Sequence, residues 1–220
     1  EGARAAAFAG ARLTAADLHD AGITVNCTPV LDVPEAGSHD IIGDRAFSFD
    51  PDVVGDLGRA VVEGTLAGGV LPVIKHVPGH GRARADSHLA LPRIDASAEE
   101  LIEVDFRPFM ALCHAPLAMT AHVLLPAFDE KRPASVSPVI MGEVIRELIG
   151  LTGLVMSDDI GMKALGGSMG ERAGAVIDAG CDVALHCSGD FDEMREVARV
   201  VPPLEGDSAG RFAAAIAELV

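Results

Sequence analysis

The sequence predicts an α/β protein with a parallel sheet, and among such folds it favours a TIM-type (β/α)8 barrel. Helical patterns alternate with short apolar runs along the whole chain, which is typical of parallel βα units. The apolar runs are almost unbroken, so each strand is expected to be buried on both faces. Ionisable residues end all five predicted strands, and only a closed barrel brings every strand end to one face. These residues are Asp32, Lys75, His76, His122, Asp158, Asp159 and His186.

The first two βα units are marked by clear helix and strand signals. Residues 2–20 carry Ala, Leu and Phe at helical spacing, and Gly22 ends this helix before the β-branched run 23–32. An Asp-Pro pair, in which an N-cap residue precedes a proline, begins the next helix over residues 50–67. Two glycines stop that helix, and the apolar run 70–74 is the second predicted strand.

The later units repeat the same order of helix, turn and strand. A capping box at Ser97-Ala-Glu-Glu100 begins a helix that runs to about residue 113. Ser137-Pro138 begins another helix, which Gly150 ends. The remaining predicted helices cover residues 168–179, 190–200 and 207–219, and the remaining predicted strands cover 116–123, 153–159 and 181–187.

The chain is expected to form one domain, residues 1–220, that is part of a barrel. Its length suits a single domain, and its 49% hydrophobic content is enough for a core. Five units in 220 residues give about 44 residues each, so eight units would need roughly 350. The chain also opens inside a helical pattern that has no N-cap. We therefore expect it to hold the last five βα units of a barrel whose N-terminal part lies upstream.

Net charge and cysteine use argue against several partners and compartments. A formal net charge of −16 repels nucleic acid and anionic membranes, so neither is an expected partner. No apolar run is long enough to span a membrane. The cysteines form no CxxC pair or regular framework, which favours buried free thiols and a reducing compartment. The four are Cys27, Cys113, Cys181 and Cys187.

The stretch with the densest chemistry is Lys75-His76-Val-Pro-Gly-His80-Gly, followed after four residues by Asp86-Ser-His88. It places three histidines, one lysine and one aspartate within fourteen residues, directly after a buried strand. Proline and glycine mark the stretch as a loop. A polar, histidine-rich loop at the C-terminal end of a buried strand is where α/β enzymes carry their active sites.

Together with four other motifs, this stretch resembles the family 3 glycoside hydrolases, and more narrowly the bacterial β-N-acetylhexosaminidases of peptidoglycan recycling. The resemblance covers nearly the whole chain. It implies a TIM-type barrel, a cytoplasmic location, no cofactor and a small carbohydrate substrate, a β-linked N-acetylglucosaminyl muropeptide from the cell wall. The other motifs are Pro29-Val-Leu-Asp32-Val33, Ile42-Gly-Asp-Arg45-Ala-Phe-Ser48, Met119-Thr-Ala-His122 and Met156-Ser-Asp158-Asp159-Ile-x-Met162.

The resemblance implies catalytic roles for three residues. Asp158 matches the nucleophile, which attacks the anomeric carbon and forms a covalent glycosyl-enzyme with retention of configuration. His88 matches the acid/base, a role that most glycosidases give to a second carboxylate; a histidine can protonate the leaving oxygen and then deprotonate water. Asp86 matches the partner of His88 in a dyad, where it orients the ring and favours the imidazolium.

Three further residues match the family's sugar ligands, namely Arg45, Lys75 and His76. A guanidinium fork suits vicinal hydroxyl groups. An ion pair of Arg45 with Asp44 or Asp50 is the structural alternative for that side chain.

The other ionisable residues near these strand ends are expected to have lesser roles. Asp159 points away from Asp158 if their strand persists, because side chains alternate along a strand. His80 lies in the Pro-Gly-His-Gly turn and is expected to shape the loop rather than contact sugar. His122 and His186 are as well suited to the core or to the support of site residues as to ligand binding.

Three alternative functions stay open at the sequence level. Histidine and aspartate at strand ends could bind a metal, although Pro78 and Gly79 make a helical His76-x3-His80 site implausible. Phosphate could replace water in the second step, which would make the protein a phosphorylase. The chain could also be a catalytically silent sugar-binding fragment, because the family's Asp-Gln-Glu-Gly-Gly-Arg segment does not occur in it.

Overall fold

A parallel four-stranded sheet forms the centre of the computed structural model, which describes residues 1–37, 42–84 and 90–219. The strand order follows the chain, β1-β2-β3-β4, and every pairing is parallel. This is the order that consecutive βα units produce, so the predicted α/β class with a parallel sheet is confirmed. The strands are β1 (Val25–Asn26), β2 (Leu71–Val77), β3 (Leu117–Thr120) and β4 (Leu154–Met156).

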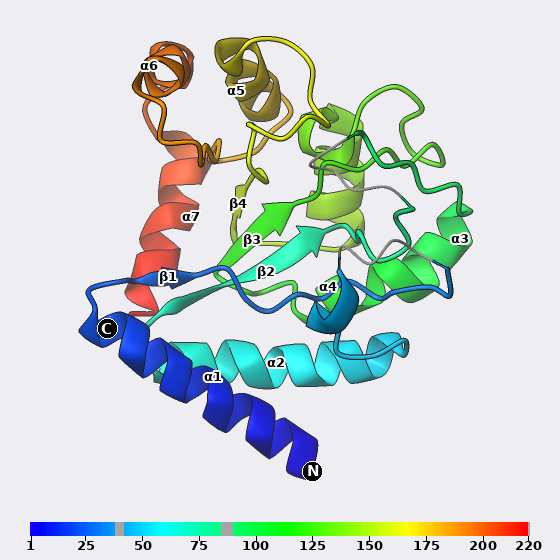
Figure 1. The fold of residues 1–220 in the computed structure, drawn as a ribbon, viewed down its shortest axis with the longest axis vertical. Coiled ribbons are helices and arrows are strands. Elements are labelled where there is room, and N and C mark those ends of the chain that lie inside the picture. The colour runs from blue at the N-terminus through cyan, green and yellow to red at the C-terminus, as the bar shows by residue number, and fades with distance from the viewer. Residues whose placement is uncertain (38–41, 85–89, 220) are drawn as a thin grey trace.

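Helices connect the strands and flank the sheet, and α1 and α2 lie side by side along it (Figure 1). The predicted capping box at Ser97 and Glu100 forms, since each side chain accepts the backbone N–H of the other residue, and Ser168 and Glu171 form a second box that was not predicted. None of the helices in the described ranges is both long and apolar enough to cross a membrane. The α-helices are α1 (Gly2–Asp20), α2 (Pro51–Ala67), α3 (Ala98–Glu100), α4 (Arg107–Ala111), α5 (Met169–Asp178), α6 (Phe191–Val200) and α7 (Gly206–Ala217). Wider π-helical turns cover Leu101–Asp105 and Ile140–Leu148, and 3-10 turns cover Gly43–Arg45 and Ala134–Val136.

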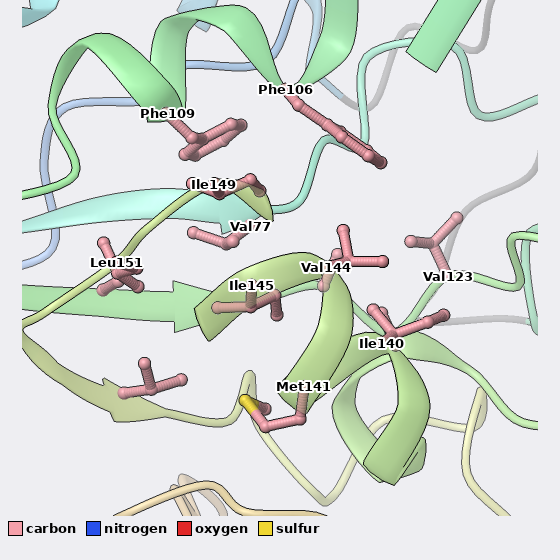
Figure 2. Packing of buried hydrophobic residues seen from close by; sticks show 14 of the residues in the cluster. Val77, Phe106, Phe109, Val123, Ile140, Met141, Val144, Ile145, Ile149 and Leu151 are labelled. Carbon is pink, nitrogen blue, oxygen red and sulfur yellow. The ribbon is translucent and has the colours of Figure 1, made fainter. Parts of the chain in front are cut away.

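The main core lies between the sheet and the helical segments that follow β2 and β3. Phe106 and Phe109 pack near Val77 of β2, and Ile145 lies beside them (Figure 2). These side chains are fully buried. Because full burial of such a side chain contributes roughly 1.5–3 kcal/mol, this cluster fixes the helices against the strands that carry the site.

Two strands differ in length from the prediction, for local reasons. β1 stops at Asn26 because the Thr28 N–H turns back to the Asn26 carbonyl and Pro29 has no N–H to donate. Pairing resumes in a single bridge between Val30 and Lys75. β2 runs to Val77, three residues beyond the predicted end, so Lys75 and His76 belong to the strand rather than to the loop after it.

The predicted fifth strand runs beside β4 but forms only one bridge, Met156 to Val183. The Val155 N–H, which a regular ladder would use, donates instead to the Asp182 carboxylate at 2.8 Å. The backbone N–H groups of Asp182 and Val183 both donate to the Val155 carbonyl. At this position the Asp182 side chain, rather than a backbone carbonyl of the fifth segment, accepts the Val155 N–H.

Candidate active site

A pocket of about 390 Å³ lies at the C-terminal ends of the strands. Four predicted site residues meet in it: the ligands Arg45, Lys75 and His76, and the nucleophile Asp158. The other two predicted catalytic residues, Asp86 and His88, lie outside the described residues. The pocket is lined by Cys27, Ile42, Arg45, Lys75, His76, His80, Met119, Asp158, Asp159, Met162, Leu185 and Cys187.

His76 is held from behind by Asp32, a carboxylate with no solvent exposure. Asp32 Oδ2 lies 2.6 Å from His76 Nδ1, and Asp32 Oδ1 accepts the backbone N–H groups of His80 at 2.7 Å and His76 at 3.4 Å. Burial acts to raise the pKa of Asp32, but the charge of His76 and these hydrogen bonds outweigh it and lower the pKa. Asp32 is thus an ionised acceptor, and His76 Nδ1 must carry the proton.

His122 contacts the backbone of Asp159, and its ring is the tautomer protonated on Nε2, whereas His76 is protonated on Nδ1. Its Nε2 lies 3.0 Å from the Asp159 carbonyl oxygen, which can only accept, so Nε2 carries the proton. Burial lowers the pKa of His122, against the opposing charge of Asp158, and keeps the ring neutral. Nδ1 then accepts from the Ser135 hydroxyl at 2.7 Å. His122 does not line the pocket, so it acts on the site through the backbone of Asp159.

Asp158 and Asp159 line the same pocket, and the strand whose continuation was expected to point Asp159 away does not reach them. β4 ends at Met156, so the alternation of side chains has stopped before this pair. Asp158 is 9% exposed, and its Oδ1 accepts the backbone N–H of Asp159 at 2.8 Å. Asp159 Oδ1 accepts the N–H groups of Gly161 and Cys187, so this carboxylate ties two loops together while Asp158 faces the pocket.

The loop after β2 is packed closely between two neighbouring segments. A Cβ at Gly81 would lie 2.0 Å from the Val33 carbonyl oxygen, which leaves room for glycine alone. Gly79 has φ +140°, and a Cβ there would lie 3.0 Å from Cβ of Asp105. The two glycines therefore let the loop pass between the end of the first strand segment and the helical turn that carries Asp105.

His80 both shapes this loop and lines the pocket. Its N–H bond to Asp32 agrees with the predicted loop role, while its ring nitrogens have no hydrogen-bond partner among the described residues. Burial lowers the pKa of His80, and Asp32 only partly opposes this. His186 lies outside the pocket lining, with Nε2 2.8 Å from the Glu193 carboxylate.

Two residues of the site were not predicted from the sequence, Asp32 in its supporting role and Cys187 on the pocket wall. All four cysteines are free, but only Cys181 is buried, and Cys187 is exposed, so the prediction of buried thiols is wrong for most of them. Among the other lining residues, Ile42, Met119 and Met162 belong to the quoted motifs but had no assigned role, and Cys27 and Leu185 have no sequence signal of their own. Within the described ranges, no group of three or more His, Cys, Asp or Glu residues is arranged to hold a metal ion.

Residues 4–216 match the profile described as "Glycosyl hydrolase family 3 N terminal domain". The β-hexosaminidase of Idiomarina loihiensis is 36% identical over 202 residues, which are 90% of this chain and 60% of that protein. The β-hexosaminidase of Neisseria gonorrhoeae is 38% identical over 207 residues, 91% of this chain and 56% of that protein. The chain thus spans little more than half the length of these curated relatives.

Solved structures agree with the sequence comparison. A glycoside hydrolase family 3 β-N-acetylglucosaminidase from Paenibacillus superposes with a TM-score of 0.89 at 29% identity and covers 98% of this chain and 44% of that one. NagZ from Neisseria gonorrhoeae, in complex with N-trifluoroacetyl-D-glucosamine, gives a TM-score of 0.86 at 34% identity and covers 96% of this chain and 61% of that one.

Proposed function

The chain belongs to glycosyl hydrolase family 3, and from this membership we propose that it forms the catalytic face of a retaining β-N-acetylhexosaminidase. The proposed reaction removes β-linked N-acetylglucosamine from muropeptide fragments of the cell wall. The family resemblance predicted from the motifs is confirmed by the match to residues 4–216, and the TIM-type barrel class is confirmed with it. The activity is proposed for a protein whose barrel includes this chain.

The observation that supports this function is the meeting of four side chains in one pocket. Arg45 and Lys75 supply cations, and His76 supplies a ring nitrogen for sugar hydroxyl groups. Asp158 supplies a carboxylate that is mostly shielded from water yet faces the same space. A shielded carboxylate beside cationic and imidazole side chains can supply the nucleophile of covalent glycosyl transfer, while the acid/base role is proposed for His88.

In the proposed mechanism, Asp158 attacks the anomeric carbon while the glycosidic C–O bond breaks. His88 donates its proton to the leaving oxygen, and in the second step it takes a proton from the water that attacks the glycosyl-enzyme. Asp86 orients His88. The result is retention of configuration at the anomeric carbon, because two displacements occur on opposite faces. The proposed location is the cytoplasm, where small muropeptides would be the substrate.

The test is to trap the covalent intermediate on a full-length protein with a complete barrel. We would use a 5-fluoro glycosyl fluoride of N-acetylglucosamine, whose ring fluorine slows hydrolysis of the adduct. Mass spectrometry should find the adduct on the peptide that contains Asp158, and Asp158→Asn should abolish it. Asp159→Asn is the matched control, because Asp159 lines the same pocket but its Oδ1 is engaged with two backbone N–H groups. An adduct on Asp159 or on no residue would contradict the nucleophile assignment.

A second candidate is a sugar-binding fragment without turnover, which the partial coverage of the relatives favours. It predicts that calorimetry detects saturable binding of N-acetylglucosamine while an aryl glycoside assay detects no product. If product does form, analysis for N-acetylglucosamine 1-phosphate in phosphate buffer separates a phosphorylase from a hydrolase.

A further inference from the structure

We propose that Asp32 is a positioning residue of the sugar site: it fixes the proton of His76 on Nδ1 and so presents Nε2 to the pocket as a hydrogen-bond acceptor for a sugar hydroxyl. The proposal rests on the proposed function, because it assigns a sugar as the ligand. It adds a positioning residue to the site, one that contacts no substrate and acts on the sugar through the His76 ring.

The two oxygens of Asp32 have separate tasks. Oδ1 accepts two backbone N–H groups, those of His76 and His80, and so ties the strand end to the loop that follows it. Oδ2 is 2.6 Å from the ring nitrogen Nδ1 of His76. Because an ionised carboxylate has no proton to give, Nδ1 must be the donor. When the ring holds this one proton, its lone pair lies on Nε2, the nitrogen left for the pocket.

The position of Asp32 supports a role in holding the ring rather than in contacting sugar. Asp32 has no exposed surface and does not line the pocket, whereas the His76 side chain does line it and is 10% exposed. The carboxylate lies at the end of the segment that bridges to β2 through Val30 and Lys75, so the sheet itself sets its distance from His76. The tilted ring of His80, 6.0 Å from that of His76 between centroids, forms the adjacent wall.

Asp32→Asn is the informative substitution because it keeps the shape and reverses one hydrogen bond. The two backbone N–H groups at Oδ1 will retain the amide oxygen there, so the amide NH2 must occupy the place of Oδ2. That NH2 can only donate, so His76 Nδ1 must accept and the ring proton must move to Nε2. We expect a change of tautomer with the backbone bonds preserved.

The test measures the ring nitrogens of His76 by 15N NMR in the full 220-residue chain at neutral pH, with His76→Gln used to assign the signals. The wild type should show a protonated Nδ1 and a bare Nε2, and Asp32→Asn should show the reverse. Calorimetry with N-acetylglucosamine should show roughly two- to tenfold weaker binding by Asp32→Asn, because the sugar hydroxyl that donates to Nε2 would have to turn and accept from Nε2–H instead.

Asp105→Asn is the matched control, because Asp105 is equally buried beside the same loop but contacts Arg82 rather than a pocket residue. It should leave both the tautomer and the affinity unchanged. In a His76→Ala background, Asp32→Asn should cause no further loss of affinity, because Asp32 acts through His76.

The outcomes separate this proposal from the proposed function. An unchanged His76 tautomer in Asp32→Asn, or an equal loss of affinity in Asp105→Asn, would overturn the positioning role while leaving a sugar-binding function standing. A wild-type chain that binds no N-acetylglucosamine would count against the proposed function, and the NMR experiment would still decide whether Asp32 sets the tautomer. Further loss of affinity from Asp32→Asn in the His76→Ala background would show that Asp32 does not act through the ring.

Discussion

Asp32 and Asp105 are two buried carboxylates on either side of the loop that follows β2, and they differ in how many donors reach them. Asp32 receives three: one ring N–H and two backbone N–H groups. Asp105 receives one guanidinium N–H, from Arg82 at 2.7 Å, and its Oδ1 has no hydrogen-bond partner among the described residues. The pKa of Asp32 is lowered, whereas burial raises the pKa of Asp105 to about 6 against the opposing charge of Arg82.

The comparison teaches that equal burial does not determine the charge of a carboxylate. Loss of water raises the pKa of both groups, and the number and direction of the donors decide whether ionisation survives it. The three donors keep Asp32 ionised, so it can accept a hydrogen bond from the His76 ring. Asp105 takes up a proton at its pKa of about 6, and because burial makes its ionisation costly, its ion pair with Arg82 stabilises the fold less than its short distance suggests.

The largest expected effect is on stability when Asp32 is removed. Asp32→Ala leaves two backbone N–H groups and a ring nitrogen of His76 buried without an acceptor, so the free energy of unfolding should fall by ~3–5 kcal/mol. Urea denaturation at pH 7 measures this. Asp105→Ala is the paired control and should cost less than ~2 kcal/mol, because it also removes a carboxylate that is costly to ionise. Equal losses would break the distinction between the two sites.

The pH dependence of stability should have opposite signs at the two carboxylates. Asp105 binds its proton more tightly in the folded state, so its stabilising contribution is present below pH 3.8 and is lost as the pH rises through about 6, by up to ~3 kcal/mol. Asp32 has the lowered pKa, so its contribution is present above pH 3.8 and is lost on further acidification.

Urea denaturation between pH 4 and 7 isolates the Asp105 contribution when wild type is compared with Asp105→Asn. The stability of the wild type relative to this variant should decline by up to ~3 kcal/mol across the range. A difference that stays constant with pH would show that Asp105 is ionised throughout, as an ordinary ion-paired aspartate would be.

A smaller effect is expected when Asp105 loses its cation. Arg82→Gln removes the charge that opposes burial, so the pKa of Asp105 should rise above about 6 by one unit or more. A titration of the side-chain carboxyl by 13C NMR measures this shift directly. Arg93→Gln is a suitable control, because Arg93 pairs with Asp95 on the exposed surface. A fall in the pKa of Asp105 on loss of Arg82 would contradict the assignment of causes.

Much of the fold could be predicted from local sequence signals. Helix starts were the most predictable features, because caps such as Ser97 with Glu100 depend on residues three positions apart. The ends of strands were less predictable. β1 ends at a tight turn from Thr28 N–H to the Asn26 carbonyl, and the fifth segment is interrupted by the bond from Val155 N–H to Asp182, which joins residues distant in sequence. Periodicity within one segment contains no information about such bonds.

The residues of the candidate site also differ in how far they could be predicted from local sequence. Arg45, Lys75, His76 and Asp158 could be identified as candidates from motifs, and the structure places them in one pocket, while their roles remain predictions. The contact of Asp32 with His76 joins residues 44 positions apart, so no local motif contains it. A signal did exist, since Asp32 ends the strand predicted to neighbour the one that carries His76, and register in a parallel pair brings such ends together.

The smallest loss of stability is expected from a substitution at Ser135, which is hydrogen-bonded to the buried, neutral ring of His122. This pair contains no carboxylate, unlike Asp32 and Asp105. With a neutral ring, Ser135→Ala removes one uncharged hydrogen bond, and the free energy of unfolding should fall by ~1 kcal/mol. The direction of this hydrogen bond depends on the charge of His122. Ser135 donates to Nδ1 of a neutral ring but would accept from Nδ1 of a charged one. A loss of ~2–3 kcal/mol, the range for a charge-assisted bond, would show that His122 is protonated and that the nearby Asp158 and Asp159 outweigh its burial. Urea denaturation at pH 7 and pH 8 distinguishes the two states, because only a charged ring would make the loss depend on pH in that range.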